Sequence, residues 1–329
     1  MNKKQILSLI FLFALALPLV SCTTQPSGGD QTSDNAPETT IEVLVSTSAG
    51  LAYEVNSDGK TCTITGIGSC KETKIIIGEY IDEYKIVAIA QDAFSGNRDI
   101  TSVTISDSVT SIGKQAFSKC IALKSVTIPN GVTNIAEAMF YSCVALESIT
   151  IPEGVKSIGN ATFCGCVSLK NVTVPDSVTS IGDDVFEECS SLEYNEYDNA
   201  LYLGNDKKPY VCLIKAKSRD ITSCNINNNT KVITNFAFYY CKKLKSIIIP
   251  ESVTNIGDDA FNGCEVLESI TIPNSVNSIG NGLFTYGKVL SDITFIGTKA
   301  EWSAIAKGED WDAETGSYTI HCTDGNITK

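Results

Sequence analysis

Apolar and polar positions alternate in a pattern that recurs every 23 residues through the middle of the chain. Three blocks between residues 110 and 178 follow one another without a gap. The pattern enters at Tyr84, is interrupted after Glu193, resumes at Lys231 and fades towards residue 298. Such self-similarity is typical of stacked repeats, in which a single unit cannot bury its apolar face alone. Residues 84–298 are therefore predicted to form a solenoid.

One limb of each repeat is predicted to be a short parallel strand. Leu123, Val126 and Ile128 follow the spacing L-x-x-V-x-I, so alternate side chains point inward and Thr127 points outward. A proline follows each strand, and because proline has no N–H it cannot continue a central ladder. The strand is expected to end at these prolines: Pro129, Pro152, Pro175, Pro250 and Pro273.

The other limb of each repeat carries the motif I-G-x-x-A-F-x-x-C. Ile112, Ala116 and Phe117 are expected to point inward, with the aromatic ring filling the broad middle of the coil. This limb is predicted to be a short helical or 3₁₀ turn. Stacking the units at about 4.8 Å would bury all the apolar faces together.

The repeat V-x-I-P-x-x-V-x-x-I-G-x-x-A-F-x-x-C-x-x-L closely resembles the BspA-like type of leucine-rich repeat over residues 84–298. The resemblance implies a right-handed, β-rich solenoid with N- and C-terminal caps. The turn after the strand departs from ordinary leucine-rich repeats, because the Asn that closes it there is replaced here. The replacing residues are Gly131, Gly154, Ser177, Ser252 and Ser275. This turn must therefore satisfy its backbone groups in another way.

Both ends of a solenoid expose unpaired strand and apolar core, and both ends of this repeat region are flanked by segments suited to cover them. Residues 46–83 are predicted to form an N-terminal cap, with a hairpin that turns at Ser57-Asp58-Gly59 and a degenerate repeat. Residues 299–329 are predicted to form a C-terminal cap. Large side chains suited to covering the core occur there: Trp302, Trp311 and Tyr318.

An insertion at residues 194–230 interrupts the fifth repeat and is predicted to project from the solenoid as a β-hairpin. Insertions in repeat proteins tend to lie on the binding face. Aromatic rings dominate binding hot spots. A candidate binding patch is therefore formed by the tyrosines in and near the insertion, although these rings would equally serve to pack the hairpin onto the solenoid. They are Tyr194, Tyr197, Tyr202, Tyr210, Tyr239 and Tyr240.

The first 22 residues have the features of a bacterial lipoprotein signal peptide. Lys3 and Lys4 precede an apolar stretch from Ile6 to Val20, which is too short for a comfortable membrane span. The stretch ends in L-V-S-C, which resembles a lipobox and implies lipidation of Cys22. The alternative is an ordinary signal peptide with a chance Cys. Residues 23–45 are rich in Thr, Ser, Pro, Gly and Asp and are predicted to be a flexible tether.

The thirteen cysteines fall into distinct groups. Two pairs flank predicted hairpins, Cys62 with Cys70 and Cys212 with Cys224, and they are candidate disulfides in an exported protein. Six others share one repeat position, where Cys packs as a small buried hydrophobe: Cys120, Cys143, Cys166, Cys189, Cys241 and Cys264. Cys164 with Cys166 lacks the second pair that a zinc site requires, so no metal is expected.

Composition argues against nucleic acid and against catalysis. The formal net charge of -13 offers no clustered positive field for phosphates. His321 is the single histidine, and no nucleophile, metalloprotease or phosphate-loop motif is present. Carboxylate pairs such as Asp183-Asp184 and Asp258-Asp259 recur at matching repeat positions and indicate a solvated face. No cofactor and no enzyme activity are expected.

The family resemblance implies a surface-anchored adhesion or protein-binding lipoprotein. Its partners would be host matrix proteins or neighbouring cells, and it would contact the membrane through its lipid anchor alone. No Asp follows Cys22 as an inner-membrane retention signal, so the outer membrane or the cell surface is the expected location. The alternative function is a glycan- or nutrient-binding lipoprotein of an outer-membrane uptake system.

Overall fold

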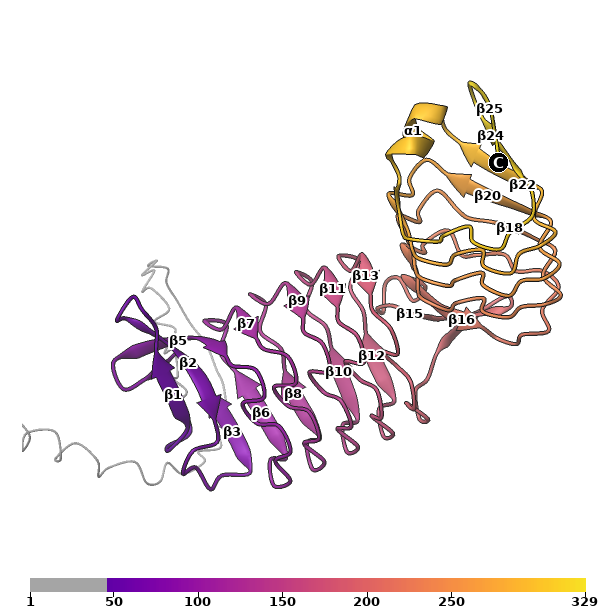
Figure 1. Ribbon diagram of the computed structural model, residues 1–329. Coiled ribbons are helices and arrows are strands. Elements are labelled where there is room, and N and C mark those ends of the chain that lie inside the picture. Colours follow the sequence, from indigo (N-terminus) through magenta and orange to yellow (C-terminus); the bar gives the residue numbers. More distant parts are fainter. Residues whose placement is uncertain (1–45) are drawn as a thin grey trace, which may run out of the picture. The chain divides into compact units, whose positions relative to one another are not determined.

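The computed structural model of the chain describes residues 46–329, and Leu44–Lys329 form one compact unit. The predicted signal peptide with Cys22 and the predicted tether at 23–45 lie outside the described residues. The described chain is a solenoid of coils built from short strands and turns (Figure 1). Its one helix is α1 (Lys299–Ala304), within the predicted C-terminal cap.

The strands that follow each repeat Leu stack in parallel and form what we call sheet A. In the pair β6–β8, for example, Val103 lies opposite Val126 and Thr104 opposite Thr127. The inward Val or Ile is buried or half-buried and the central Thr is mostly exposed, as predicted. Most of these strands end before the Pro, and β20 ends on it. The sheet A strands are β3 (Lys74–Ile77), β6 (Ser102–Ile105), β8 (Ser125–Thr127), β10 (Ser148–Thr150), β12 (Asn171–Thr173), β18 (Ser246–Ile248), β20 (Ser269–Pro273), β22 (Asp292–Ile296) and β24 (Thr319–Cys322).

On the opposite limb, the residues that end in the repeat Ile also pair from coil to coil, and we call these strands sheet B. Ile158, for example, lies between Ile135 and Ile181 in a parallel ladder. The sheet B strands are β5 (Tyr84–Ile89), β7 (Ser111–Ile112), β9 (Asn134–Ile135), β11 (Ser157–Ile158), β13 (Ser180–Ile181), β17 (Val232–Ile233), β19 (Asn255–Ile256), β21 (Ser278–Ile279) and β23 (Ala306–Lys307).

The rest of the return limb is a chain of turns, so the expected helical or 3₁₀ conformation is not formed. Two residues of this limb in nearly every coil have positive φ, for example Gln115 at 57° and Lys119 at 58°. With this backbone conformation, alternate N–H groups point at the next coil. The N–H of Phe117, for example, donates to the carbonyl of Met139 in the next coil at 3.0 Å. The backbone is thus satisfied between coils, whereas a helix would satisfy it within one coil.

The turn after sheet A is closed without the Asn of ordinary leucine-rich repeats. The N–H of Val132 donates to the carbonyl of Pro129 at 3.1 Å, and the equivalent bond recurs after the other four repeat prolines. Two of the turn serines add a hydroxyl bond to the previous coil, Ser177 to the Val155 carbonyl at 2.7 Å and Ser275 to the Val253 carbonyl at 2.8 Å.

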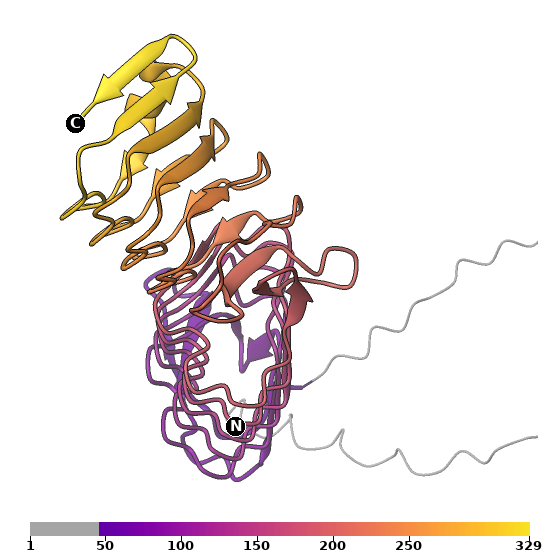
Figure 2. The ribbon, with the colours of Figure 1, turned by 90° about the vertical axis from the view of Figure 1, so that its right-hand side faces the viewer.

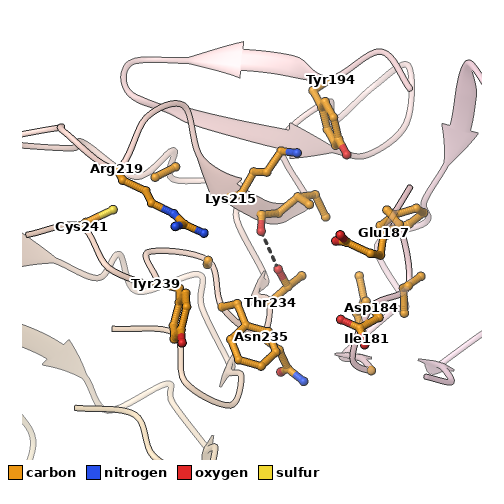
Figure 3. A pocket seen from close by; sticks show the side chains of 17 residues that line it. Ile181, Asp184, Glu187, Tyr194, Lys215, Arg219, Thr234, Asn235, Tyr239 and Cys241 are labelled. Atoms are coloured by element: carbon orange, nitrogen blue, oxygen red, sulfur yellow. Dashed lines mark hydrogen bonds between the residues drawn. The ribbon is translucent and has the colours of Figure 1, made fainter. Parts of the chain in front are cut away.

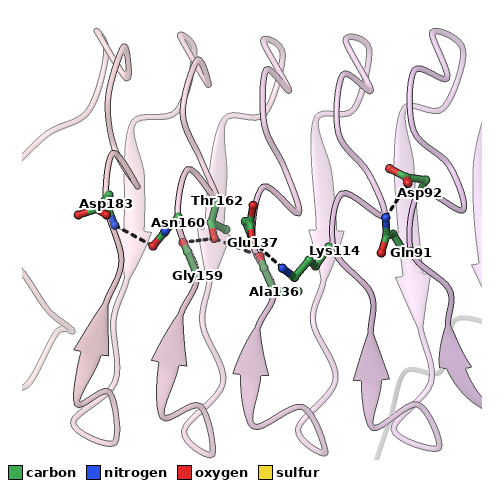
Figure 4. Close-up of polar contacts among 9 residues, drawn as sticks. All are labelled: Gln91, Asp92, Lys114, Ala136, Glu137, Gly159, Asn160, Thr162 and Asp183. Carbon is green, nitrogen blue, oxygen red and sulfur yellow. Dashed lines mark hydrogen bonds and ion pairs between the residues drawn. The ribbon is translucent and has the colours of Figure 1, made fainter.

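Side-chain amides instead form a ladder beside sheet B, two residues after the repeat Ile. The Asn160 amide oxygen accepts from the Asp183 N–H at 3.0 Å, and the Asp258 carboxylate accepts from the Asn281 N–H at 2.7 Å. In earlier coils this position holds an ion pair, Lys114 with Glu137 at 2.7 Å (Figure 4). The adjacent carboxylates of the D-D pairs thus lie at the surface of one face.

The repeat phenylalanines form two stacked columns inside the coils. The first column runs through Phe94, Phe117, Phe140, Phe163 and Phe186, with centroids 5.3 to 5.8 Å apart. The second column runs through Phe238, Phe261 and Phe284 at 5.2 and 6.0 Å. Because each inner ring lies between two others, it is removed from water almost completely.

Five of the six repeat cysteines donate a weak S–H bond to a phenylalanine carbonyl of the preceding coil, and Cys241 contacts the Ser218 carbonyl at 3.9 Å instead. Cys143 Sγ lies 3.1 Å from the Phe117 carbonyl oxygen, and Cys264 Sγ lies 3.2 Å from that of Phe238. Burial raises the pKa of the Cys120, Cys166, Cys189 and Cys264 thiols to about 12. These thiols therefore act as packed, neutral core groups.

The ends of the solenoid are covered by extra elements. At the N-terminal end, β1 (Ala52–Val55) pairs antiparallel with β2 (Thr61–Gly66), which continues sheet B alongside β5, and β4 (Tyr80–Ile81) pairs with β5. At the other end, α1 begins with a capping box between Thr298 and Glu301. There β25 (Gly325–Thr328) closes sheet A, and Trp302, Trp311 and Tyr318 pack edge to face.

Replacing Phe140 by Ala should lower the free energy of unfolding by about 3–5 kcal/mol, because a fully buried ring with a neighbour on each side leaves a cavity. Phe186→Ala should cost less, because this ring is partly exposed and stacks on one side only. Denaturant unfolding of the two variants, which change the same repeat position, measures the difference. Equal losses would contradict the stacked-column interpretation.

At pH 8, alkylation of the folded protein should label Cys164 and Cys322, which are partly exposed, well before the repeat cysteines. A pKa of about 12 leaves roughly one thiol in ten thousand as the reactive thiolate at that pH. Peptide mapping after timed iodoacetamide treatment, with an unfolded sample as the reference, tests this order. Labelling of Cys166 as fast as Cys164 would show that the coils open readily.

Candidate functional site

The regular stack is interrupted once, by a three-stranded meander at residues 195–216. It consists of β14 (Asn195–Tyr197), β15 (Ala200–Leu203) and β16 (Cys212–Ala216), paired antiparallel in that order. The end of β15 contacts sheet A of the preceding coils, where the Val174 N–H donates to the Gly204 carbonyl at 2.7 Å. β16 pairs in parallel with β17 and begins sheet B of the following coils. We call the coils before the meander the first stack and those from β16 onward the second stack.

The two strands of the predicted hairpin are β15 and β16. They were expected to project from the solenoid, but several of their side chains are buried in the core. Tyr202, Leu203, Cys212 and Leu213 are all buried. Gly204 has no room for a side chain, since a Cβ would lie 2.1 Å from the Lys208 carbonyl oxygen. The meander therefore contributes to two hydrophobic clusters, Leu203 and Cys212 to one and Tyr202 and Leu213 to the other. Its strands lie between the coils of the two stacks (Figure 2).

A cleft of about 350 Å³ opens where the two stacks meet. Its first-stack wall comes from the turns after β13, with Asp184, Phe186 and Glu187. Lys215 and Arg219, at and after the end of β16, face this wall together with Tyr239 of the next coil (Figure 3). We call this feature the junction cleft.

The walls of the junction cleft carry opposite charges and aromatic rings. Two carboxylates, Asp184 and Glu187, stand on the first-stack wall. The cations opposite them lie near tyrosine rings, with Lys215 Nζ 5.0 Å from the Tyr194 centroid and Arg219 Cζ 5.8 Å from the Tyr239 centroid. Such cation–π contacts hold the basic groups at the rim of the cleft. The cleft therefore offers both charged and aromatic surface to a ligand.

Burial changes the titration of groups around the cleft. It raises the pKa of Tyr194 to about 12 and that of the Cys241 thiol to about 11. It also raises the pKa of Tyr239. The tyrosines therefore remain neutral hydrogen-bonding groups at physiological pH, and Cys241 is not an activated nucleophile.

A second cleft of about 350 Å³ lies along sheet B at the same junction and is lined by backbone and by the amide ladder. One bond of the ladder spans the junction here, from Asn235 Nδ2 to Asp183 Oδ1 at 2.5 Å. Asp183 thus links the two stacks, whereas its neighbour Asp184 lines the junction cleft.

The six tyrosines proposed as a binding patch do not form one surface. Tyr202 is fully buried, and its ring packs against Tyr210, which in turn packs against Tyr197. Tyr194 lines the junction cleft from the meander side. Tyr239 lines the cleft from the second stack, and its ring lies 4.5 Å from that of Tyr240.

The candidate disulfide cysteines are four separate buried thiols. Cys62 and Cys70 both pack in the core of the first stack. Cys212 belongs to the core of the first stack and Cys224 to that of the second. All four thiols are free in the structure, and both disulfides stay predictions.

The sequence placed Asp184 on a solvated face, and it did not indicate Phe186, Lys215 or Arg219 as site residues. A signal for Lys215 and Arg219 lay in the segment C-L-I-K-A-K-S-R, residues 212–219, which begins like the return limb of a repeat but carries no Phe. The interrupted period concealed this alignment.

Between residues 46 and 329, no group of three or more His, Cys, Asp or Glu side chains is placed to hold a metal ion. His321 lies on β24, between β22 and β25, and its Nε2 is 3.1 Å from Asp292 Oδ1. None of the helices in that range is long and apolar enough to span a membrane.

Known structures of bacterial leucine-rich repeat proteins are similar to this chain. A leucine-rich repeat protein of T. pallidum is 26% identical with a TM-score of 0.46, covering 66% of this chain and 88% of its own. A leucine-rich cell surface protein of Faecalibacterium prausnitzii is 26% identical with a TM-score of 0.37, covering 79% and 97%. A leucine-rich repeat protein of Bacteroides capillosus is 34% identical with a TM-score of 0.34, covering 39% and 95%.

Superposition over whole chains is poor in all three cases, so the family relationship depends on the repeat itself. A comparison with curated proteins gives no match. Residues 87–206 and 216–305 match the model of the BspA type leucine-rich repeat region, in six copies. The matched ranges hold the coils of both stacks and include most of the meander. The chain belongs to the BspA-type leucine-rich repeat family.

Proposed function

We propose that this chain is a non-catalytic, surface-anchored lipoprotein that binds protein partners through the junction between its two stacks. Leucine-rich repeat proteins of this kind serve protein–protein interaction or surface binding. The observation that carries the proposal is the junction cleft, because elsewhere the repeat side chains fill the interior of the coils. At the junction, aromatic and charged groups meet in a cleft of about 350 Å³, a size typical of ligand sites.

Exposed aromatic side chains at the cleft and on the meander support binding of a protein. Phe236, which lines the cleft, is 40% exposed, and Tyr197 on β14 of the meander is also 40% exposed. Aromatic side chains bury much area at little entropic cost and are enriched among interface hot spots. The mixed charge of the cleft walls would orient a partner without attracting polyanions.

Anchoring depends on the N-terminal sequence. The L-V-S-C motif supports lipidation of Cys22, and several acyl chains would hold the protein stably on a bilayer. The polar segment that follows would place the coils away from the lipid surface. The proposed location is the outer membrane or the cell surface.

Replacing Cys22 by Ala should release the protein from the membrane fraction, because the acylated sulfur would be lost. Fractionation of cells that express the variant, followed by immunoblotting, measures the release. The matched control is Cys322→Ala, which removes a partly exposed thiol of the C-terminal cap and should leave the protein in the membrane fraction. Retention of the Cys22→Ala variant would refute the lipid anchor.

Tyr197→Ser should weaken binding to a protein partner about tenfold, because an exposed ring at an interface contributes roughly 1–2 kcal/mol. The chain without its first 22 residues is passed over immobilised matrix proteins and over a polysaccharide panel, and surface plasmon resonance gives the affinities. Tyr80→Ser is the matched control, since Tyr80 is 50% exposed but lies on β4 of the N-terminal cap. Binding to polysaccharides alone, or an equal loss in the control, would sink the proposal.

A further inference from the structure

Coil-to-coil hydrogen bonds fix which residue of the meander replaces the repeat phenylalanine. In a regular coil the N–H of this Phe donates to the residue that precedes the Phe of the next coil, as Phe140 does to Thr162 at 3.0 Å. At the start of the second stack, the Ala216 N–H donates to the Ala237 carbonyl at 2.7 Å, and Ala237 precedes Phe238. By this backbone bond Ala216 occupies the phenylalanine position of the coil. The Cys241 thiol, whose equivalents contact a Phe carbonyl, contacts the Ser218 carbonyl at 3.9 Å instead, and neither Ala216 nor Ser218 carries a ring.

One ring is thus missing from the phenylalanine columns, and the junction cleft lies at the gap. Phe186, the last ring of the first stack, stacks on Phe163 at 5.8 Å and has no ring beyond it among the described residues. It is partly exposed, whereas the other repeat phenylalanines are buried. Phe186 and Ala216 both line the cleft.

Backbone partners are missing at the same place. In the coil before, the N–H groups of residues 161, 163 and 165 donate to carbonyls of the following coil at 2.7 to 3.0 Å. The equivalent N–H groups belong to Asp184, Phe186 and Glu188, and within residues 46–329 none of the three has a hydrogen-bond acceptor. They alternate along the chain, and two of these residues line the cleft.

We propose that the junction cleft binds an extended segment of a partner protein that carries an aromatic residue. Carbonyls of the segment would accept from the N–H groups of Asp184, Phe186 and Glu188, and its ring would enter between Phe186 and Ala216 as the missing member of the column. The inference rests on the proposed binding function and specifies its site and the chemistry of its partner.

The hydrogen-bonding pattern selects a peptide over a sugar. An extended chain presents carbonyls on one edge at every second residue, which matches N–H groups at every second residue of the cleft wall. A glycan has no such regular row of acceptors. The chain's own segment at 23–45 is not the occupant, because it contains no Phe, Tyr or Trp.

The test uses the chain from Thr23 onward, which holds the whole compact unit Leu44–Lys329. The probe is the blocked pentapeptide acetyl-Gly-Gly-Phe-Gly-Gly-amide, titrated by ligand-observed NMR beside its analogue with Ala in place of Phe. The Phe peptide should bind at least about tenfold more tightly, which equals about 1.4 kcal/mol. Equal binding of the two peptides would overturn the proposal.

Ala216→Phe should supply the missing ring from within and abolish binding of the Phe peptide. Val144→Phe is the matched control, because it adds the same bulk at an exposed position of the first stack and should bind as the parent does. If Ala216→Phe does not fold, Phe186→Ala replaces it and should reduce the preference for Phe over Ala at least fivefold. Unchanged binding in the folded variant, or displacement of the peptide by maltohexaose, would contradict a peptide site. Since the assay needs neither membrane nor cells, a failed anchor or adhesion test leaves its result intact.

Discussion

Each coil of this protein depends on the next one for its backbone hydrogen bonds. Sheet A and sheet B pair in parallel from coil to coil, and the turns of the return limb also donate their N–H groups forward, as Phe117 does to Met139. An isolated coil would leave these groups and its apolar side chains exposed to water. These inter-coil hydrogen bonds fix the register of neighbouring coils. Equivalent Phe, Cys and Asx side chains are therefore aligned in columns.

This dependence explains why a cleft with unpaired groups forms at the meander. Inside a regular stack every inward group is already covered by its neighbours. The meander connects to sheet A of the first stack through Gly204 but to sheet B of the second through β16. Because the two connections serve different stacks, the return limb of one coil has lost the neighbour that would complete it. The junction cleft is the result.

The periodic part of the fold could be predicted from sequence, because each repeat letter has one physical task. The inward Leu, Phe and Cys, the outward Thr127 and the strand-ending prolines take the places that their pattern indicates. The return limb could not be predicted as turns, because the pattern of Ile112, Ala116 and Phe117 suits any inward-facing limb. Positive φ at Gln115 and at Ala138 gives no sequence signal, since neither residue is glycine.

The site was harder to predict for a related reason. Tyrosines near an insertion suggested a patch, yet burial depends on how β15 and β16 insert between the stacks, and this places Tyr202 in the core. Asp184 belongs to a regular repeat and Lys215 to the insertion. Only the pairing of strands in three dimensions brings them to one cleft.

Near-identical coils also leave an ambiguity that the meander resolves. A slip of one whole 23-residue unit would replace each Leu, Phe and Cys by its equivalent, so the central contacts alone hardly distinguish correct from shifted alignment. Residues 195–216 have no counterpart elsewhere in the chain and can fit one location only. The meander thus fixes the register of the coils on both sides of it, because a slip of one unit would displace residues 195–216 from their partners.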